Sequence, residues 1–267
     1  MAIFRFNVDG TVGKTTMDPS VRNFLYRNPQ YYEIVYPEPN EDTPKMCQRM
    51  FARYLLTPPS SILDLGCGTG RDLDVLSRSC QDCWGVDALT EMIDFARKER
   101  PHLRLSVGDM RSIRLNRTFD VILCMGSAFM YALTNEDVES VLRTFAVHAH
   151  EGTLLVVDIN NAATYLPGGS FERTARVEVS HAGFTASADV VQDFDRRGQL
   201  LVRHRTWSIT GQTPVKDYCK YRLFFPAELE QLLGKFGYRV VGMFDNMELE
   251  GSDLAGPRLY VASVSQT

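Results

Sequence analysis

The chain has 267 residues, of which 44% are hydrophobic and 23% are charged, and its net charge at pH 7 is -4. This length can bury a sizeable core, in one elaborated domain or in two. The acidic balance excludes the basic surface typical of nucleic-acid-binding proteins, so we expect no nucleic-acid partner. No apolar run reaches the roughly 20 residues of a membrane helix and no secretory signal is visible, so we expect a cytoplasmic protein that does not bind membranes.

The first 40 residues predict an N-terminal arm or lid rather than a long helix. Pro29, Pro37 and Pro39 interrupt any helical pattern, because proline lacks the backbone donor and clashes with the preceding turn. Tyrosines are concentrated in the same stretch. Residues 42–56 follow with apolar side chains at helical spacing, and they predict the first helix of a core.

A glycine-rich turn follows directly after the first predicted strand, at residues 61–65. The turn reads Gly66-Cys67-Gly68-Thr69-Gly70, and a helical pattern over 71–78 comes next. A strand that turns tightly into a helix directs backbone N–H groups and the positive helix end at one point, which suits a nucleotide-like ligand. The spacing differs from the Gly-x-Gly-x-x-Gly of dinucleotide dehydrogenases. An ordinary strand and helix packed on glycines is the alternative at this point.

Strands and helices alternate beyond this turn. The pattern predicts strands over 83–86, 103–107, 119–125 and 153–158 and helices over 90–99 and 135–148, and it returns with a helix over 226–236 and strands over 238–244 and 258–264. Such alternation predicts an α/β fold with a Rossmann-like, doubly wound sheet of seven strands, which binds ligands at the carboxyl ends of its strands.

Two aspartates stand where this fold binds ligands. Asp87 follows the second strand, where a carboxylate accepts hydrogen bonds from the two hydroxyls of an adenosine ribose. Asp109 follows the third strand, where a carboxylate can accept from an adenine amino group while Met110 packs on the ring. The alternatives are a helix cap for Asp87 and a loop cap for Asp109.

Residues 161–225 break the alternation. They predict four strands, over 173–180, 185–194, 200–209 and 215–225, which form an antiparallel β meander inserted after the fifth strand. The strand over 200–209 has no cleanly apolar face, so we expect both faces of the meander to be partly covered. The polar or aromatic candidates for ligand contacts on this strand, or for ordinary sheet surface, are Arg203, His204, Arg205 and Trp207.

Residues 61–70, together with Asp87 and Asp109, resemble the cofactor-binding motifs of the class I S-adenosylmethionine-dependent methyltransferases. Residues 31–36 are similar to the Y-Y-D-x-x-Y segment that leads into many small-molecule methyltransferases. Residues 124–131 resemble the C-M-F-S-S-I-G-H pattern of sugar N-methyltransferases from natural-product pathways, with Tyr131 at the position of the family histidine.

This resemblance implies S-adenosyl-L-methionine as the cofactor. We expect no metal site, because Cys80 and Cys83 form a single C-x-x-C and no second pair completes a zinc site. The cofactor-binding residues that it carries over are Tyr36, Asp64, Gly66, Cys67, Gly68, Gly70, Asp87, Ala88, Met92, Asp109, Met110 and Met125. Tyr131 and Tyr32 are implied as catalytic residues that orient the acceptor or face the sulfonium. Tyr131 departs from the proposed general base of the family, because tyrosine has a pKa of about 10 and is a poor base at neutral pH.

The predicted function is methyl transfer to a small-molecule acceptor, at an amine nitrogen, in natural-product or antibiotic biosynthesis. The alternatives are C- or O-methylation of a natural-product intermediate, an NAD-dependent oxidoreductase, and a non-catalytic protein that binds the cofactor. The predicted domains are an arm or lid at 1–40, a cofactor-binding core at 41–160 and 226–267, and a β insert at 161–225. We expect the insert to cover the acceptor site, and it could also form a homodimer contact.

Overall fold

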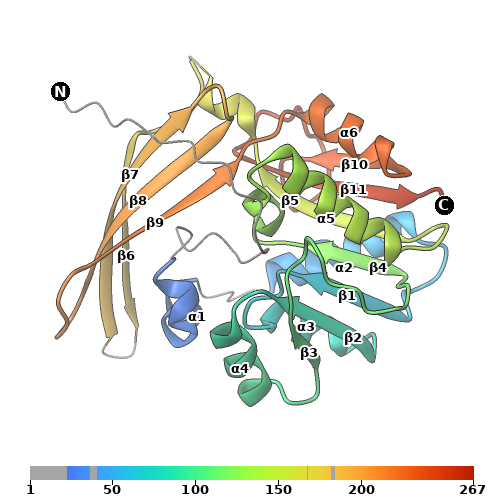
Figure 1. Ribbon diagram of the computed structural model, residues 1–267, viewed down its shortest axis with the longest axis horizontal. Coiled ribbons are helices and arrows are strands. Elements are labelled where there is room, and N and C mark those ends of the chain that lie inside the picture. The colour runs from blue at the N-terminus through green and yellow to red at the C-terminus, as the bar shows by residue number, and fades with distance from the viewer. Residues whose placement is uncertain (1–22, 37–40, 167, 182–183) are drawn as a thin grey trace.

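The computed structural model describes residues 23–36, 41–166, 168–181 and 184–267, so much of the predicted N-terminal arm lies outside the described residues. Two β-sheets organise the described chain (Figure 1). The larger sheet has seven strands in the order β10-β11-β5-β4-β1-β2-β3, and the smaller has four in the order β6-β7-β8-β9. The predicted α/β fold with a seven-stranded sheet and an antiparallel meander is confirmed.

The elements have the following bounds. The large sheet contains β1 (Ser61–Leu65), β2 (Asp82–Asp87), β3 (Arg104–Val107), β4 (Val121–Cys124), β5 (Leu154–Asn160), β10 (Tyr238–Phe244) and β11 (Arg258–Ser265). The small sheet contains β6 (Thr174–His181), β7 (Phe184–Asp195), β8 (Leu200–Ile209) and β9 (Val215–Arg222). The α-helices are α1 (Pro29–Val35), α2 (Asp42–Tyr54), α3 (Arg71–Ser77), α4 (Thr90–Glu99), α5 (Asn135–Val147) and α6 (Pro226–Lys235). Short 3-10 helices are η1 (Leu25–Arg27), η2 (Ala128–Tyr131) and η3 (Ala162–Tyr165).

Helices cover both faces of the large sheet, because its central strands are apolar on both sides. Leu63 and Leu65 of β1 belong to a core to which α5 contributes Phe145 and α6 contributes Leu229. Ile62, which points to the opposite face, belongs to a second core that includes residues of α2, α3 and α4. All of β1 is buried, so its carboxyl end is held firmly in the middle of the sheet.

The strand order places a ligand crevice beside β1. Strands β1 to β5 run parallel, and β11 alone in this sheet runs antiparallel to both of its neighbours. The chain passes from β1 outward to β2 and β3, and then returns to the other side of β1 as β4. In an open α/β sheet, ligands bind outside the carboxyl ends of the strands at such a reversal.

Several predicted boundaries move by a few residues. The strand predicted over 119–125 is β4 at Val121–Cys124, because Gly126 and Ser127 take positive φ angles of 65° and 63° and turn the chain out of the sheet. The strand predicted to end at residue 158 continues to Asn160, since Arg258 of β11 pairs with that residue. The helix predicted over 42–56 ends at Tyr54.

The small sheet has one well-covered face, which the sequence pattern did not indicate. Along β8, Leu201, Arg205 and Trp207 are buried, whereas His204 between them is exposed. Arg205 is buried because its guanidinium pairs with Asp217 of β9, at 2.7 Å from Nε to Oδ1 and 3.1 Å from Nη2 to Oδ2. A charged residue in the covered face hid the amphipathic alternation. The expectation that both faces would be partly covered holds for the second face, where Val202 and Thr206 are half-buried, but the first face is covered more fully than expected.

The described part of the N-terminal segment lies between the two sheets (Figure 1). Toward the small sheet, the backbone N–H of Phe24 donates to the carboxylate of Asp217. Toward the large sheet, Arg27 pairs with Glu91 of α4 at 2.8 Å. Residues 23–36 therefore connect the insert to the edge of the core where the crevice lies.

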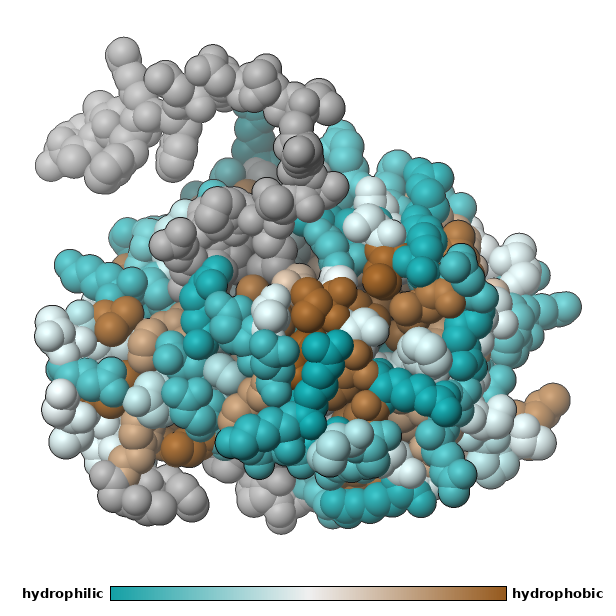
Figure 2. All heavy atoms as spheres, turned by 60° about the horizontal axis from the view of Figure 1, so that its bottom comes forward, coloured by the Kyte–Doolittle hydropathy of each residue, from teal (hydrophilic) through white to brown (hydrophobic). Residues whose placement is uncertain are grey.

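Surface chemistry is mixed on the face shown in Figure 2, where hydrophobic side chains gather in the middle and hydrophilic ones surround them. Within the described ranges, no helix has the length and apolar character needed to cross a lipid bilayer.

Candidate functional site

The turn after β1 is packed so tightly that Gly66 has to be glycine. Its φ is +88°, and a Cβ at this position would lie 2.5 Å from the Cβ of Ala128. The N–H groups of Gly66 and Cys67 donate to the carbonyl of Val86 at 2.7 and 3.1 Å, which ties the turn to β2. At Gly68, where φ is +55°, a Cβ would meet nothing within 4 Å. Open space therefore lies beside the turn, and a ligand can approach its backbone there.

Asp87 at the end of β2 holds this turn from the other side. Its Oδ2 accepts from the N–H of Gly68 and its Oδ1 from the N–H of Leu89, both at 2.9 Å. The helix-cap alternative does not describe it, since the N-cap of α4 is Leu89 and has no side-chain cap bond. Burial raises the pKa of Asp87, against the effect of the backbone N–H groups that it accepts from. A carboxylate has about four acceptor positions, so two remain that could accept from a pair of ligand hydroxyls.

Asp64 of β1 is a buried carboxylate that lacks a hydrogen-bond donor at one of its oxygens. Its Oδ1 is buried and accepts no hydrogen bond from the described residues. Burial first, and then the nearby charges of Asp87 and Asp158, raise its pKa from 3.8 to about 7. A buried carboxylate without a partner is costly, and a ligand that brought an ammonium group to this point would supply the missing charge and donors.

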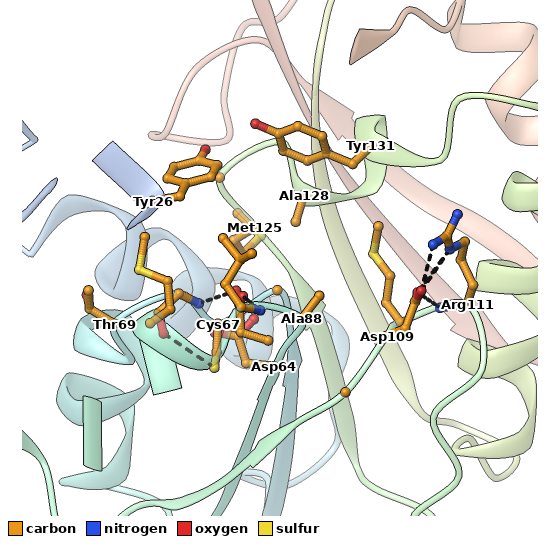
Figure 3. A pocket seen from close by; sticks show the side chains of 18 of the residues that line it. Tyr26, Asp64, Cys67, Thr69, Ala88, Asp109, Arg111, Met125, Ala128 and Tyr131 are labelled. Carbon is orange, nitrogen blue, oxygen red and sulfur yellow. Dashed lines mark hydrogen bonds and ion pairs between the residues drawn. The ribbon is translucent and has the colours of Figure 1, made fainter. Parts of the chain in front are cut away.

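A cavity of about 380 Å³ opens over these groups. Its lining includes most of the predicted residues, namely Tyr32, Asp64, Gly66, Cys67, Gly68, Asp87, Ala88, Met92, Asp109, Met110, Met125 and Tyr131. The sequence missed other lining residues, which are Tyr26, Thr69, Arg71, Asp72, Leu89, Gly108, Arg111, Gly126, Ala128, Leu133, Thr134 and Asp137. In Figure 3, Tyr26 and Tyr131 face the space from the side opposite Asp64 and Cys67.

Two predicted cofactor residues lie elsewhere. Gly70 lines neither this cavity nor the second one described below. It begins α3 with a φ of +74°, and a Cβ there would lie 3.3 Å from the side chain of Leu103, so its glycine serves the turn itself. Tyr36 lines the second cavity instead of the first.

Asp109 is already engaged by an arginine, which the prediction of an adenine contact did not include. Arg111 donates to it through Nε at 3.0 Å to Oδ1 and through Nη2 at 2.7 Å to Oδ2, and also through its backbone N–H. Arg111 in turn donates to Asp137 of α5 at 2.9 Å (Figure 3 shows the Asp109–Arg111 contacts). The loop-cap alternative is thus present in the structure. Oδ2 of Asp109 also accepts from Nε of Arg111 at 3.1 Å, so both carboxylate oxygens are engaged by this arginine.

Tyr131 belongs to a group of tyrosines from three parts of the chain. Its hydroxyl donates to that of Tyr221 of β9 at 3.2 Å, and its ring lies 6.2 Å from that of Tyr26. Burial raises the pKa of Tyr131 well above its ordinary value. Tyr131 is therefore a neutral hydroxyl at physiological pH and can orient a ligand, but it cannot act as a base in its resting state.

A second cavity of about 290 Å³ adjoins the first, because the two share Tyr26, Tyr32, Arg71, Asp72, Met125 and Gly126. The rest of its lining is mostly polar and comes from the N-terminal segment, α2, the loop after β4 and strands of both sheets. These residues are Asn23, Tyr36, Thr43, Ser127, Asp158, Asn160, Arg203, Tyr221, Arg258 and Tyr260. Of the four residues singled out on β8, only Arg203 lines it.

Asp158 of β5 lines this second cavity and was missed as a site residue. Its Oδ1 accepts from the N–H of Ser127 at 2.8 Å, and its Oδ2 lies 3.0 Å from Nη1 of Arg258. A buried acid at the end of an apolar strand, in Val157-Asp158-Ile159, was the available sequence signal. Asp158 links the β4 loop to β11 and so determines the shape of the cavity where the sheet ends.

The strand order, the glycine turn and the carboxylates at the ends of β1 and β2 together define a class I methyltransferase fold with a nucleoside-binding crevice. Comparison with known proteins agrees. Residues 62–152 match the family described as a methyltransferase domain. The chain is 30% identical to dTDP-4-amino-2,3,4,6-tetradeoxy-D-glucose N,N-dimethyltransferase of Saccharopolyspora spinosa, over 64% of this chain and 67% of that protein.

Further relatives and solved structures fit the same class. The chain is 36% identical to dTDP-3-amino-3,4,6-trideoxy-alpha-D-glucopyranose N,N-dimethyltransferase of Streptomyces venezuelae, but this match spans 37% of the chain and only 42% of that relative. The sugar N-methyltransferase KedS8 from Streptoalloteichus superposes with a TM-score of 0.73 at 19% identity, covering 97% of this chain and 100% of that one. The chain belongs to the methyltransferases, and it has the fold of S-adenosylmethionine-dependent members with solved structures.

Proposed function

We propose that this protein transfers a methyl group from S-adenosylmethionine to an amine nitrogen of a small molecule in a natural-product pathway. Three relatives that match the chain are named as N,N-dimethyltransferases of amino sugars linked to dTDP, and this supports an amine acceptor. The observation that carries the proposal is the pair of adjoining cavities: one beside the glycine turn suits the cofactor, and the polar one next to it suits an acceptor.

We assign the cofactor contacts by the chemistry of each group. Asp64 would pair with the ammonium of the methionine part, which meets the need of its buried oxygen. Asp87 would accept from the ribose hydroxyls. Asp109 would accept from the adenine amino group in place of its longest contact with Arg111, which runs from Nε to Oδ2 at 3.1 Å. When bound, S-adenosylmethionine supplies a methyl group that is already activated by the sulfonium charge.

The protein then has to align the acceptor and exclude water. Tyr131 and Tyr32 are proposed to do so, because both line the cofactor cavity and Tyr32 also borders the acceptor cavity. Burial raises the pKa of both hydroxyls, so they stay neutral and orient by hydrogen bonding. An amine can lose its proton to solvent before it binds, so this site needs no strong base. A hydroxyl or carbon acceptor would need one, and this favours an amine.

The proposal also assigns a role to each segment of the chain. We propose that residues 1–40 act as an arm over the site, that 41–160 with 226–267 bind the cofactor, and that the insert at 161–225 covers the acceptor and could support a homodimer. We also propose a cytoplasmic location. All six cysteines are free thiols, as is usual in a reducing compartment.

Calorimetric titration tests the cofactor, with S-adenosylhomocysteine as ligand and NAD as control. Saturable binding of the first and none of the second is expected. Mass spectrometry then follows methyl transfer to dTDP-3-amino-3,6-dideoxyglucose and to its counterpart with a 3-hydroxyl. Methylated amine without methylated hydroxyl supports the proposal. Cofactor binding without transfer to amine, hydroxyl or carbon acceptors would instead identify a non-catalytic member of the family.

A further inference from the structure

The acceptor cavity contains positive charges that differ in how they are balanced. Arg205 of β8, which does not line the cavity, is buried and pairs with Asp217, and Arg258, which does line it, lies 3.0 Å from Asp158. Arg203, two residues before Arg205 on the same face of β8, forms no ion pair with any carboxylate of the described residues. Its contacts are neutral: Nε donates to Oε1 of Gln192 at 3.0 Å, and the guanidinium lies 5.3 Å from the ring centre of Tyr221.

These neutral contacts hold the Arg203 side chain and leave much of its donor capacity free. A guanidinium has five N–H donors, and within the described chain only the Nε–H of Arg203 donates to a side-chain acceptor. Contact with the face of Tyr221 restricts the orientation of the guanidinium plane. Arg203 therefore presents a held cation, half-buried and without a balancing charge among the described residues, to a polar cavity that adjoins the cofactor cavity.

We propose that Arg203 is the anion-binding residue of the acceptor site, and that the acceptor carries a phosphate or carboxylate group that pairs with it. The planar fork of a guanidinium matches both oxyanions and can bind either through two parallel hydrogen bonds. This inference rests on the proposed function, since it names the chemical class of the acceptor of that same site. The two oxyanions share this chemistry, and the experiment separates them.

The experiment uses full-length protein saturated with S-adenosylhomocysteine. Four probes are titrated into it by calorimetry or NMR: dTDP and thymidine as the phosphate pair, and acetylglycine and acetylglycinamide as the carboxylate pair. The proteins compared are the wild type, Arg203→Gln, Arg203→Lys and Arg176→Gln. Arg176 is the control because its replacement removes the same charge from the same sheet at an exposed position that lines neither cavity.

The wild type should prefer the anion in one of the two pairs: it should bind either dTDP at least ten-fold more tightly than thymidine, or acetylglycine at least ten-fold more tightly than acetylglycinamide. Arg203→Gln should abolish that preference, Arg203→Lys should restore part of it, and Arg176→Gln should keep it. The affinity for S-adenosylhomocysteine should be the same in all four proteins, which also shows that the variants fold. A preference for dTDP identifies a phosphate acceptor, and a preference for acetylglycine identifies a carboxylate acceptor.

An equal preference in the wild type and Arg203→Gln, or no preference in the wild type, overturns the assignment of Arg203 while the proposed function stands. A wild type that fails to bind S-adenosylhomocysteine overturns both.

Discussion

Replacing Asp64 with Asn should stabilise the protein without its cofactor while weakening the cofactor complex. The Asp64 carboxylate is buried, and its pKa rises from 3.8 to about 7, first because of burial and then because of Asp87 and Asp158. The folded state therefore holds this proton more tightly than the unfolded chain does. As pH rises from 3.8 to 7, the folded protein progressively loses stability through this group.

The magnitude follows from the two pKa values. One pH unit corresponds to about 1.4 kcal/mol, so a difference of about 3 units corresponds to roughly 4 kcal/mol once the pH exceeds 7. An asparagine side chain cannot ionise, so Asp64→Asn removes this penalty. The free energy of unfolding of the variant relative to the wild type should rise by roughly 3 kcal/mol between about pH 5 and pH 8.

Urea denaturation without cofactor at four pH values across this range measures the change. Asp82→Asn is the control with the opposite sign, because burial is outweighed at Asp82 by hydrogen bonds from Arg117 and Trp84 that lower its pKa. The ionised carboxylate of this control residue stabilises the folded protein above the ordinary pKa, and this contribution disappears only in acid. The free energy of unfolding of the control variant should therefore lie below that of the wild type by a constant amount over the same pH range. If the free energies of unfolding of Asp64→Asn and the wild type changed in parallel with pH, the conclusion that Asp64 is buried without a partner would be refuted.

The same variant should bind S-adenosylhomocysteine about 10- to 100-fold more weakly, since a hydrogen bond to a charged group contributes about 1.5–3 kcal/mol. Calorimetry at about pH 8, where the wild-type carboxylate is ionised, measures this loss. A stabilised variant with unchanged affinity would place the ammonium of the cofactor elsewhere.

Three further changes test other parts of the site. Asp87→Ala should weaken binding of S-adenosylhomocysteine by about 1–3 kcal/mol, because ribose hydroxyls lose their acceptor; equal affinity in calorimetry would contradict the ribose assignment. Tyr131→Phe removes the hydroxyl that contacts Tyr221, and it should lower kcat while the affinity for S-adenosylhomocysteine stays the same; unchanged kcat would show that Tyr131 serves only packing. Asp217→Asn breaks the buried pair with Arg205 and should reduce the free energy of unfolding by about 3–5 kcal/mol in urea, and a loss below about 1 kcal/mol would contradict the pairing.

Local pattern was enough to predict the core and much of the cofactor cavity. The order of strands and helices, the glycine turn and Asp87 all follow from residues close together in sequence. Parallel strands deliver their carboxyl ends to one edge, so a polar residue just after such a strand is brought to the site by topology alone. This is why Asp87 and Asp109 could be placed without coordinates, whereas Asp64, which lies within β1, was predicted from the resemblance to the methyltransferase motifs.

Pairings across the sheets could not be predicted in this way. The insert appeared to lack a covered face because Arg205 lies in it, and only the pairing of β8 with β9 brings Asp217 to that guanidinium. Likewise, Arg111 was visible beside Asp109 in the sequence, but its link to Asp137 depends on where α5 packs.

The sequence by itself thus determined the class of protein, because periodicity and turn chemistry are local properties that can be recognised without knowing any tertiary contact. Tertiary structure decided the lining of the second cavity, to which we assign the acceptor. Asp158, Arg203, Tyr221 and Arg258 come from β5, β8, β9 and β11 and meet at one cavity. Which of these charges is neutralised and which stays available depends on distances of a few ångströms between strands far apart in the chain, and no local pattern contains that information.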